Sequence, residues 1–240
     1  MNFAEVYPEP ARLIENEQTT LKFLMDSAFI LEKYPELARD ARNAFFKNAA
    51  DRSFSFESHI DVSHDGYRRR VFVGGLLSLD ATGCYDDVSY YLMICRDIVI
   101  PSYVLRKFHF DVALPGKSRR RLHPLFHLQY CGKLSPRLTG LGFSIEHLEK
   151  WLSEPRLWYT PVSVALLLHC LFREFRDEVS HKLSQRKEWL ELVKANENLV
   201  LRPYFQNSFE FFSNKEKKTK LFMDFLYGVE EPCLPASHIG

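Results

Sequence analysis

The chain has 240 residues, of which 46% are hydrophobic and 14% aromatic, and its formal net charge is +1. An apolar content this high excludes a disordered chain, and a chain of this length needs neither disulfides nor a structural metal to fold. The near-zero charge gives no general attraction to nucleic acid or acidic membranes, although basic clusters stand at residues 68–70, 117–121 and 215–220. The length allows one large domain or two small ones, and we expect a single domain over residues 1–240.

The cysteines are odd in number and form no Cys-x-x-Cys pair. This indicates a reducing compartment and argues against a disulfide framework or a zinc knuckle. The N-terminus has no basic stretch followed by an apolar run, so we expect no signal peptide. The longest apolar run, residues 162–168, is far shorter than the roughly 20 residues of a membrane helix. We therefore expect a cytoplasmic protein that does not cross a membrane and holds no cofactor.

The segment 8–50 carries apolar side chains at three- and four-residue spacing, which predicts helices. Tyr34-Pro35 divides this segment, because the residue before a proline is pushed out of the helical conformation. Proline is also favourable at the first position of a helix. We therefore expect a pair of helices within residues 1–50, the second of them over residues 36–48.

From residue 53 the apolar period changes to two, which predicts strands as far as residue 132. The first three strands are expected within residues 53–62, 68–79 and 88–100, and two more form a hairpin within residues 103–131. Strands that follow one another in this way usually pair as an antiparallel meander. Gly74-Gly75 interrupts the second strand and indicates a bulge or a close backbone approach.

After residue 132 the helical period returns. Helices are predicted over residues 144–152, 164–175, 178–195 and 203–212, with a short amphipathic piece at 220–227. Thr160-Pro161 is typical of a helix start and predicts the N-cap of the apolar helix. The chain should therefore adopt an α+β fold, in which a helical layer over residues 144–228 covers one face of the sheet and residues 229–240 form a tail.

The hairpin within residues 103–131 carries the polar groups of most chemical interest. Lys107, His109 and Asp111 alternate with apolar residues, and His127 and Gln129 do the same in the second strand. If paired residues have numbers that sum to 236, His109 lies opposite His127 and Lys107 lies opposite Gln129. Directly opposite side chains have Cβ atoms about 4.5–5.5 Å apart. The sequence therefore predicts a polar site on one sheet face.

Two histidines at one site can act as general base and general acid, because the unperturbed pKa of imidazole lies near neutrality. Lys107 would stabilise negative charge on a phosphoryl group, and Asp111 would orient one imidazole. Two histidines and a carboxylate can instead hold a divalent metal. An ordinary half-exposed sheet face without chemistry is the third interpretation of these residues.

The loop of this hairpin is basic. Its cationic residues, which would neutralise phosphates beside the histidines, are Lys117, Arg119, Arg120 and Arg121. A solvated hairpin tip is the alternative interpretation. Gln129 and Arg156 are expected to line a pocket, although Arg156 would equally suit a structural ion pair with a buried carboxylate.

Two further patterns have mainly structural interpretations. Glu57, His59 and Asp61 alternate along the first strand, where such a row ligates a metal or, more commonly, keeps a charged strand edge from aggregating. His169 lies on an apolar helix and is expected to be a hydrogen-bonded core histidine. No glycine-rich phosphate loop and no Gly-x-Ser-x-Gly motif is present.

One stretch resembles known sequences. It contains Phe108-His109-Phe110-Asp111, then His123-Pro124-x-x-His127-Leu128-x-x-x-Gly132, then a Pro-Arg segment before an apolar helix. Over residues 108–175 the chain resembles uncharacterised bacterial families found near mobile elements, phage-defence loci and toxin–antitoxin loci. The resemblance implies a role in defence and supplies no mechanism.

Our hypothesis from the sequence is a defence or toxin-type protein that acts on or with nucleic acid, as a metal-independent ribonuclease with His109 and His127 as the acid–base pair. The alternative is a non-enzymatic subunit of a larger complex. Its partner would dock on the aromatic C-terminal helices through exposed Phe209, Phe211 and Phe212.

Overall fold

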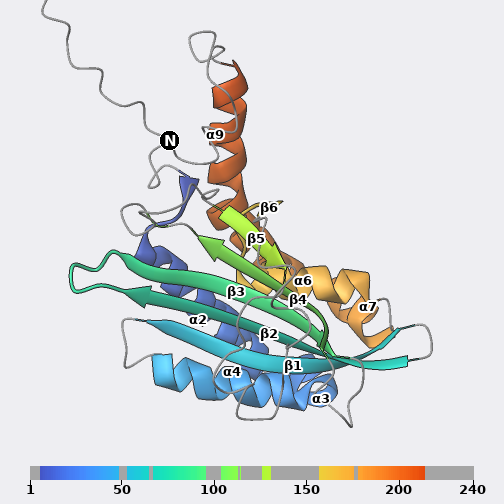
Figure 1. Ribbon diagram of the computed structural model, residues 1–240. Coiled ribbons are helices and arrows are strands. Elements are labelled where there is room, and N and C mark those ends of the chain that lie inside the picture. The colour runs from blue at the N-terminus through green and yellow to red at the C-terminus, as the bar shows by residue number, and fades with distance from the viewer. Residues whose placement is uncertain are drawn as a thin grey trace, which may run out of the picture.

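An antiparallel sheet with helices on one face forms the centre of the computed structural model (Figure 1), which describes residues 6–48, 53–64, 67–95, 104–112, 114, 126–130, 157–175 and 178–213. The strands are β1 (Phe54–His64), β2 (Tyr67–Leu79), β3 (Tyr85–Cys95), β4 (Val104–Val112), β5 (Phe126–Tyr130) and β6 (Leu157–Trp158). The helices are α2 (Pro10–Asp26), α3 (Ala28–Lys33), α4 (Pro35–Asn48), α6 (Val164–Glu174), α7 (Glu178–Ser184), α8 (Lys187–Asn196), η1 (Glu197–Leu201) and α9 (Arg202–Ser213). The predicted α+β fold is confirmed.

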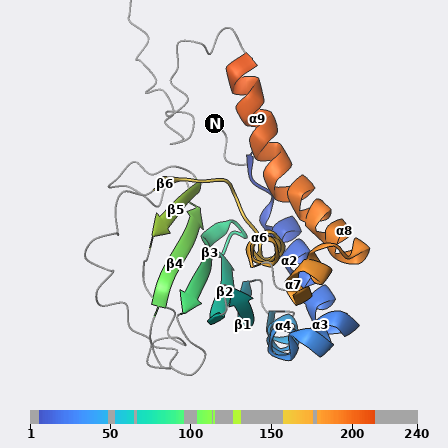
Figure 2. The same cartoon turned by 90° about the vertical axis from the view of Figure 1, so that its right-hand side faces the viewer.

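The strands lie in the sheet in chain order, each antiparallel to the next, as predicted for a meander. Viewed along the sheet edge, α2, α4 and α6 lie on the same side of the strands (Figure 2). The third strand begins earlier than expected, at Tyr85, and the end predicted for it, residues 96–100, lies outside the described residues. The helical layer on one sheet face is therefore as predicted. The other face carries polar residues together with a second, smaller apolar cluster formed by Phe72, Met93, Cys95 and Val104.

The N-terminal helices divide at the predicted Tyr34-Pro35 step, and also at Ser27, where the sequence suggested no break. The Ser27 side chain caps α3 by accepting a hydrogen bond from the Ile30 backbone N–H. Serine suits this position because its oxygen satisfies an N–H group that has no partner inside the helix. The expected pair of helices is therefore three helices.

Gly74 and Gly75 are needed for the packing of two tyrosine rings. β2 runs through both residues without a break, and its register shifts only later, between Ser78 and Leu79. A Cβ on Gly74 would lie 2.3 Å from the ring of Tyr91, and one on Gly75 would lie 2.8 Å from the ring of Tyr90. Of the two predicted alternatives, the bulge is wrong and a close approach to the backbone is observed, because each glycine lets a ring from β3 lie across β2, one ring on each face.

The C-terminal helices differ from prediction at two boundaries. Helix α6 begins at Val164, and its N-cap is Ser163 rather than Thr160, since the Ser163 side chain accepts a hydrogen bond from the Leu166 N–H. The single helix expected over residues 178–195 is two helices, α7 and α8. A π-helical turn, η1, then joins α8 to α9 in one long rod (Figure 2).

The core lies between the sheet and the helices. Alternate residues of β1 to β5 point into it, and they pack against the apolar faces of α2, α4 and α6. Trp189 and Tyr204 complete it from the C-terminal helices, and both are at most 1% exposed. None of the described helices is long and apolar enough to span a bilayer. The helices expected at 144–152 and 220–227, and the tail at 229–240, lie outside the described residues.

Candidate functional site

The polar residues gather on the sheet face that points away from the helices, called here the open face. One line of residues crosses five strands in register, and we call it the transverse row: Glu57, Gly74, Tyr91, His109 and Gln129. Lys107 and Asp111 lie on either side of this row, two residues along β4 from His109. The strand pairing therefore brings a histidine, two carboxylates, a lysine and a tyrosine onto one surface.

The predicted register of the central hairpin is wrong by two residues. Paired residues have numbers that sum to 238, so His109 lies opposite Gln129 and His127 lies opposite Asp111. A shift of two residues keeps every side chain on its predicted face, and for this reason alternation alone does not distinguish the two registers. His109 and His127 are consequently diagonal neighbours, which in an antiparallel pair lie about 7–8 Å apart.

His109 and Asp111 form the best-defined contact of the open face. Nδ1 of His109 lies 2.9 Å and 3.0 Å from the two oxygens of the Asp111 carboxylate. Both side chains are about one-quarter exposed. A carboxylate on Nδ1 fixes the imidazole orientation and leaves Nε2 as the proton acceptor. Within the described part of the chain, Nε2 has no hydrogen-bond partner.

Lys107 is buried rather than half-exposed, with only 1% of its surface accessible. Its Nζ lies 5.7 Å from the centre of the Tyr91 ring, within the range of a cation–π contact. The Tyr91 hydroxyl donates a hydrogen bond to the Glu57 carboxylate across β2, over the space that Gly74 leaves. The Lys107 side chain thus lies inside the protein, two residues along β4 from His109.

A third carboxyl group, that of Asp87, lies near Asp111 and His109. Partial burial and the neighbouring Asp111 raise the pKa of Asp87, while His109 partly offsets the effect. A neighbouring negative charge raises the pKa of a carboxyl group because the two charges repel. Asp87 and Tyr91 were not predicted as site residues, although both alternate with the apolar residues of β3 and therefore face the same way as His109.

In the row Glu57, His59 and Asp61, the last two side chains contact neighbouring side chains. Asp61 accepts two hydrogen bonds from Arg70, at 2.8 Å and 3.0 Å. The His59 ring packs on Phe72 with 5.4 Å between ring centres, and burial together with Arg70 lowers its pKa. The described residues contain no group of three or more ligands suited to a metal ion. The contacts of His59 and Asp61 are therefore structural.

Several predicted site residues cannot be placed. Those that lie outside the described residues are Lys117, Arg119, Arg120, Arg121 and Arg156, and only the backbone of His127 is described. Gln129 is partly buried on the open face, at the end of the transverse row. His169, predicted to be a hydrogen-bonded core histidine, accepts a hydrogen bond at Nδ1 from the Trp189 indole, 3.1 Å away.

Comparisons with protein-family models, with curated proteins and with solved structures gave no significant match. No relative therefore supplies a function for the open face.

Proposed function

We propose that the open face catalyses metal-independent cleavage of RNA, with His109 as the general base. The observation that carries this proposal is the contact between His109 Nδ1 and the Asp111 carboxylate on a partly exposed surface. An imidazole oriented in this way is the usual proton acceptor of acid–base enzymes. The role in defence rests on the sequence resemblance, and RNA cleavage suits a toxin-type protein.

In the proposed step, Nε2 of His109 takes the proton of a ribose 2′-hydroxyl. The 2′ oxygen attacks the adjacent phosphorus, the bond from phosphorus to the 5′ oxygen breaks, and that oxygen leaves with a proton from a second acid. His127, which is opposite Asp111 in the register, is our candidate for this acid. The products are a 2′,3′-cyclic phosphate and a 5′-hydroxyl end.

Two features of the neighbourhood support a phosphodiester substrate. Lys107 supplies a positive charge in a buried position, where an electrostatic interaction with a developing negative charge is stronger than in water. The basic residues Lys117 to Arg121 belong to the segment that joins β4 to β5, the two strands that carry the histidines. They are our candidates for contacts with the phosphate backbone.

The test is cleavage of a labelled single-stranded RNA by the full chain in the presence of EDTA, beside a DNA of the same sequence. We expect the RNA to be cut to cyclic-phosphate products and the DNA to stay intact. His109→Ala should lower the rate by about 100-fold or more, because that is the usual contribution of a general base. His169→Gln is the matched control, since it changes a histidine on α6 that lies in the helical layer, away from the open face.

Cleavage that persists in His109→Ala, or that stops when EDTA is added, would contradict the proposal. A further variant tests the basic loop. Changing Arg119, Arg120 and Arg121 together to Ala should weaken RNA binding and reduce its salt dependence, because each lost phosphate contact lowers the slope by about one.

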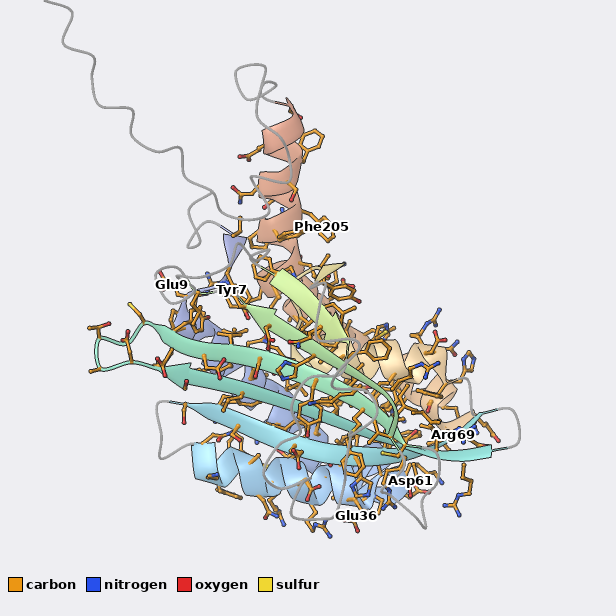
Figure 3. All side chains as sticks on the ribbon, in the orientation of Figure 1. Tyr7, Glu9, Glu36, Asp61, Arg69 and Phe205 are labelled. Atoms are coloured by element: carbon orange, nitrogen blue, oxygen red, sulfur yellow. The ribbon has the colours of Figure 1, made fainter. Side chains whose placement is uncertain are left out.

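A second function is favoured by helix α9, which extends beyond the edge of the sheet (Figures 1 and 2). Phe205, labelled in Figure 3, is 52% exposed, and Phe209, one helical turn later on the same side, is 71% exposed. Exposed aromatic residues of this kind suit a docking site for a partner protein. The side chains of Phe211 and Phe212 lie outside the described part of the chain.

The two functions can be separated with one variant. Changing Phe205 and Phe209 to Ser should leave RNA cleavage unchanged if the chain is the enzyme. A chain that does not cut RNA, and that loses a partner seen by native mass spectrometry when these two residues are changed, supports the interaction subunit instead.

A further inference from the structure

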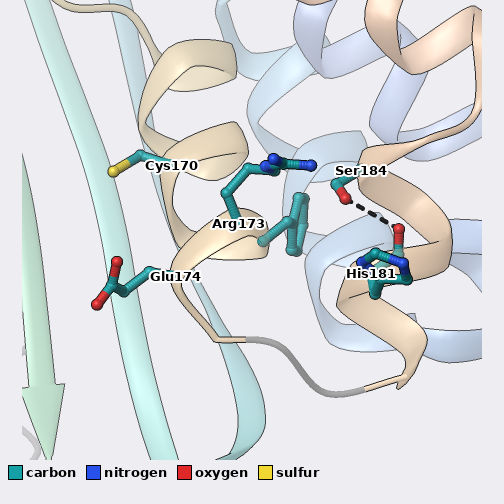
Figure 4. Close-up of a pocket in the computed structure, with 6 residues that line it drawn as sticks. Cys170, Arg173, Glu174, His181 and Ser184 are labelled. Carbon is teal, nitrogen blue, oxygen red and sulfur yellow. Dashed lines mark hydrogen bonds between the residues drawn. The ribbon is translucent and has the colours of Figure 1, made fainter.

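A pocket of about 510 Å³ lies between α6 and α7, within the helical layer (Figure 4). The residues that line it are Cys170, Phe172, Arg173, Glu174, His181 and Ser184. Its volume falls within the range of small-molecule sites. Because α6 lies on the helical side of the sheet (Figure 2), the pocket is separate from the open face and from the function proposed for it.

The residues that line the pocket lie on two sides of helix α6. Figure 4 shows that Arg173 extends from α6 towards Ser184 of α7, and that His181 lies on the same side of α6. Cys170 and Glu174 project from the other side of α6, away from Arg173. Arg173 makes no ion pair with any residue in the described ranges. The side of the pocket between α6 and α7 therefore offers a guanidinium and an imidazole.

Buried residues hold this side of the pocket in place. Phe172 is 1% exposed, and its ring lies 5.6 Å from the rings of both Tyr34 and Trp189. Ser184 is 2% exposed, and its hydroxyl donates a hydrogen bond to the His181 carbonyl at 2.9 Å. The Arg173 and His181 side chains therefore stand on a rigid base, which reduces the entropy lost when a ligand binds.

We propose that this pocket binds a small anion that carries a phosphate or carboxylate group on an apolar body. Arg173 is the main contact, because the planar guanidinium donates two parallel hydrogen bonds to either group. His181 is the second donor. Burial and the nearby Glu174 raise the pKa of the Cys170 thiol, so the thiol stays protonated and the pocket is a binding site rather than a site of covalent chemistry.

Three probes with the same ring and different head groups test the proposal by calorimetric titration into the full chain: phenyl phosphate, benzoate and benzyl alcohol. We expect at least one of the two anions to bind, and the one that binds more tightly identifies the head group. Benzyl alcohol should not bind measurably. Arg173→Gln should raise the Kd of the anion at least tenfold, because a single charge-assisted hydrogen bond usually contributes more than a tenfold change in affinity.

Lys194→Gln is the matched control, because it removes one positive charge from an exposed position on α8 outside the pocket. It should bind the anions as the parent does. Three results would overturn the proposal: no binding of either anion at millimolar concentration, equal binding of benzyl alcohol, or equal loss in Arg173→Gln and Lys194→Gln. Arg173 is exposed, so its replacement should leave the fold intact.

Discussion

The two faces of the sheet are built from alternate residues of the same strands. A carboxyl group is buried among uncharged partners on the helix side, whereas carboxyl groups lie beside basic side chains on the open face. On the helix side, Glu17 of α2 is fully buried, where it accepts hydrogen bonds from the Tyr90 hydroxyl at 2.8 Å and from the Val164 N–H at 3.2 Å. On the open face, Asp61 and Asp111 lie beside an arginine and a histidine and stay partly exposed.

This difference has a chemical consequence. Burial raises the pKa of Glu17 from its usual 4.5 to about 7, since neither of its partners carries a positive charge. The ionisation of this carboxyl group on the helix side therefore changes the free energy of unfolding. A carboxylate beside a basic side chain on a partly exposed surface orients that side chain. The comparison predicts that substitutions on the helix side change stability and that substitutions on the open face change function.

The largest effect should come from Phe110→Ala, which removes a ring from the helix side of β4. We expect unfolding in urea to show a loss of about 3–5 kcal/mol, because the substitution leaves a cavity in the core. A loss below about 1 kcal/mol would mean that the core tolerates this cavity and that the two faces of the sheet differ less than we infer.

The next effect is a dependence on pH. Because the pKa of Glu17 is raised in the folded state, its contribution to stability is fully present below about pH 4.5 and is lost as the pH rises to about 7. The shift corresponds to about 3 kcal/mol, at 1.36 kcal/mol for each pKa unit. Glu17→Gln keeps the shape of the neutral acid and removes this loss.

The measurement is the difference in unfolding free energy between Glu17→Gln and the parent, from urea titrations at several pH values. The difference should grow in favour of the variant between pH 5 and pH 8. Other groups that titrate in this range cancel in the comparison. A constant difference would show that Glu17 does not titrate there.

A smaller effect should distinguish the neighbouring glycines. Gly75→Ala places a Cβ against the ring of Tyr90, which is 1% exposed and cannot move aside, so we expect a loss of about 1–3 kcal/mol. Gly74→Ala places a Cβ against Tyr91, which is only partly buried and can turn towards solvent. Its cost in a urea titration should be lower, while the hydrogen bond from Tyr91 to Glu57 is lost. Equal costs would contradict this account.

The fold was largely predictable because the signals that determine it are local. Alternation identified the strands and the face that each residue occupies, and the Tyr34-Pro35 step identified a helix boundary. Ser27 and Ser163 were not predicted as N-caps. Many serines in the sequence precede a segment that could form a helix, and tertiary packing determines which of them caps one. The length and geometry of the connection between β4 and β5 set the register, and alternation carries no information about either.

The candidate site was predictable in part for the same reasons. The sequence placed Lys107, His109 and Asp111 on one face, and the structure brings His109 and Asp111 into contact. Burial of Lys107 depends on residues distant in sequence, so no local pattern reveals it. Tyr91 can be recognised as a residue of the site only when Gly74 is known to lie opposite it. The absence of a side chain at Gly74 lets the Tyr91 ring reach Glu57. Catalysis by any of these residues stays a prediction.

The smallest effect on stability should come from the residue on which the proposed function depends most. His109→Ala removes a side chain that is one-quarter exposed and whose described polar contact is with Asp111. A hydrogen bond usually contributes between about 0.5 and 1.5 kcal/mol to the free energy of unfolding, so we expect the urea midpoint of this variant to lie close to that of the parent. A double-mutant cycle with Asp111→Asn should give a coupling energy in the same range. If the coupling exceeds about 2 kcal/mol, the pair holds the fold together, and loss of RNA cleavage in His109→Ala then follows from unfolding rather than from a missing base. If the coupling is small and cleavage is still lost, the open face carries chemistry that the fold does not need, which is the difference that the comparison of the two faces predicts.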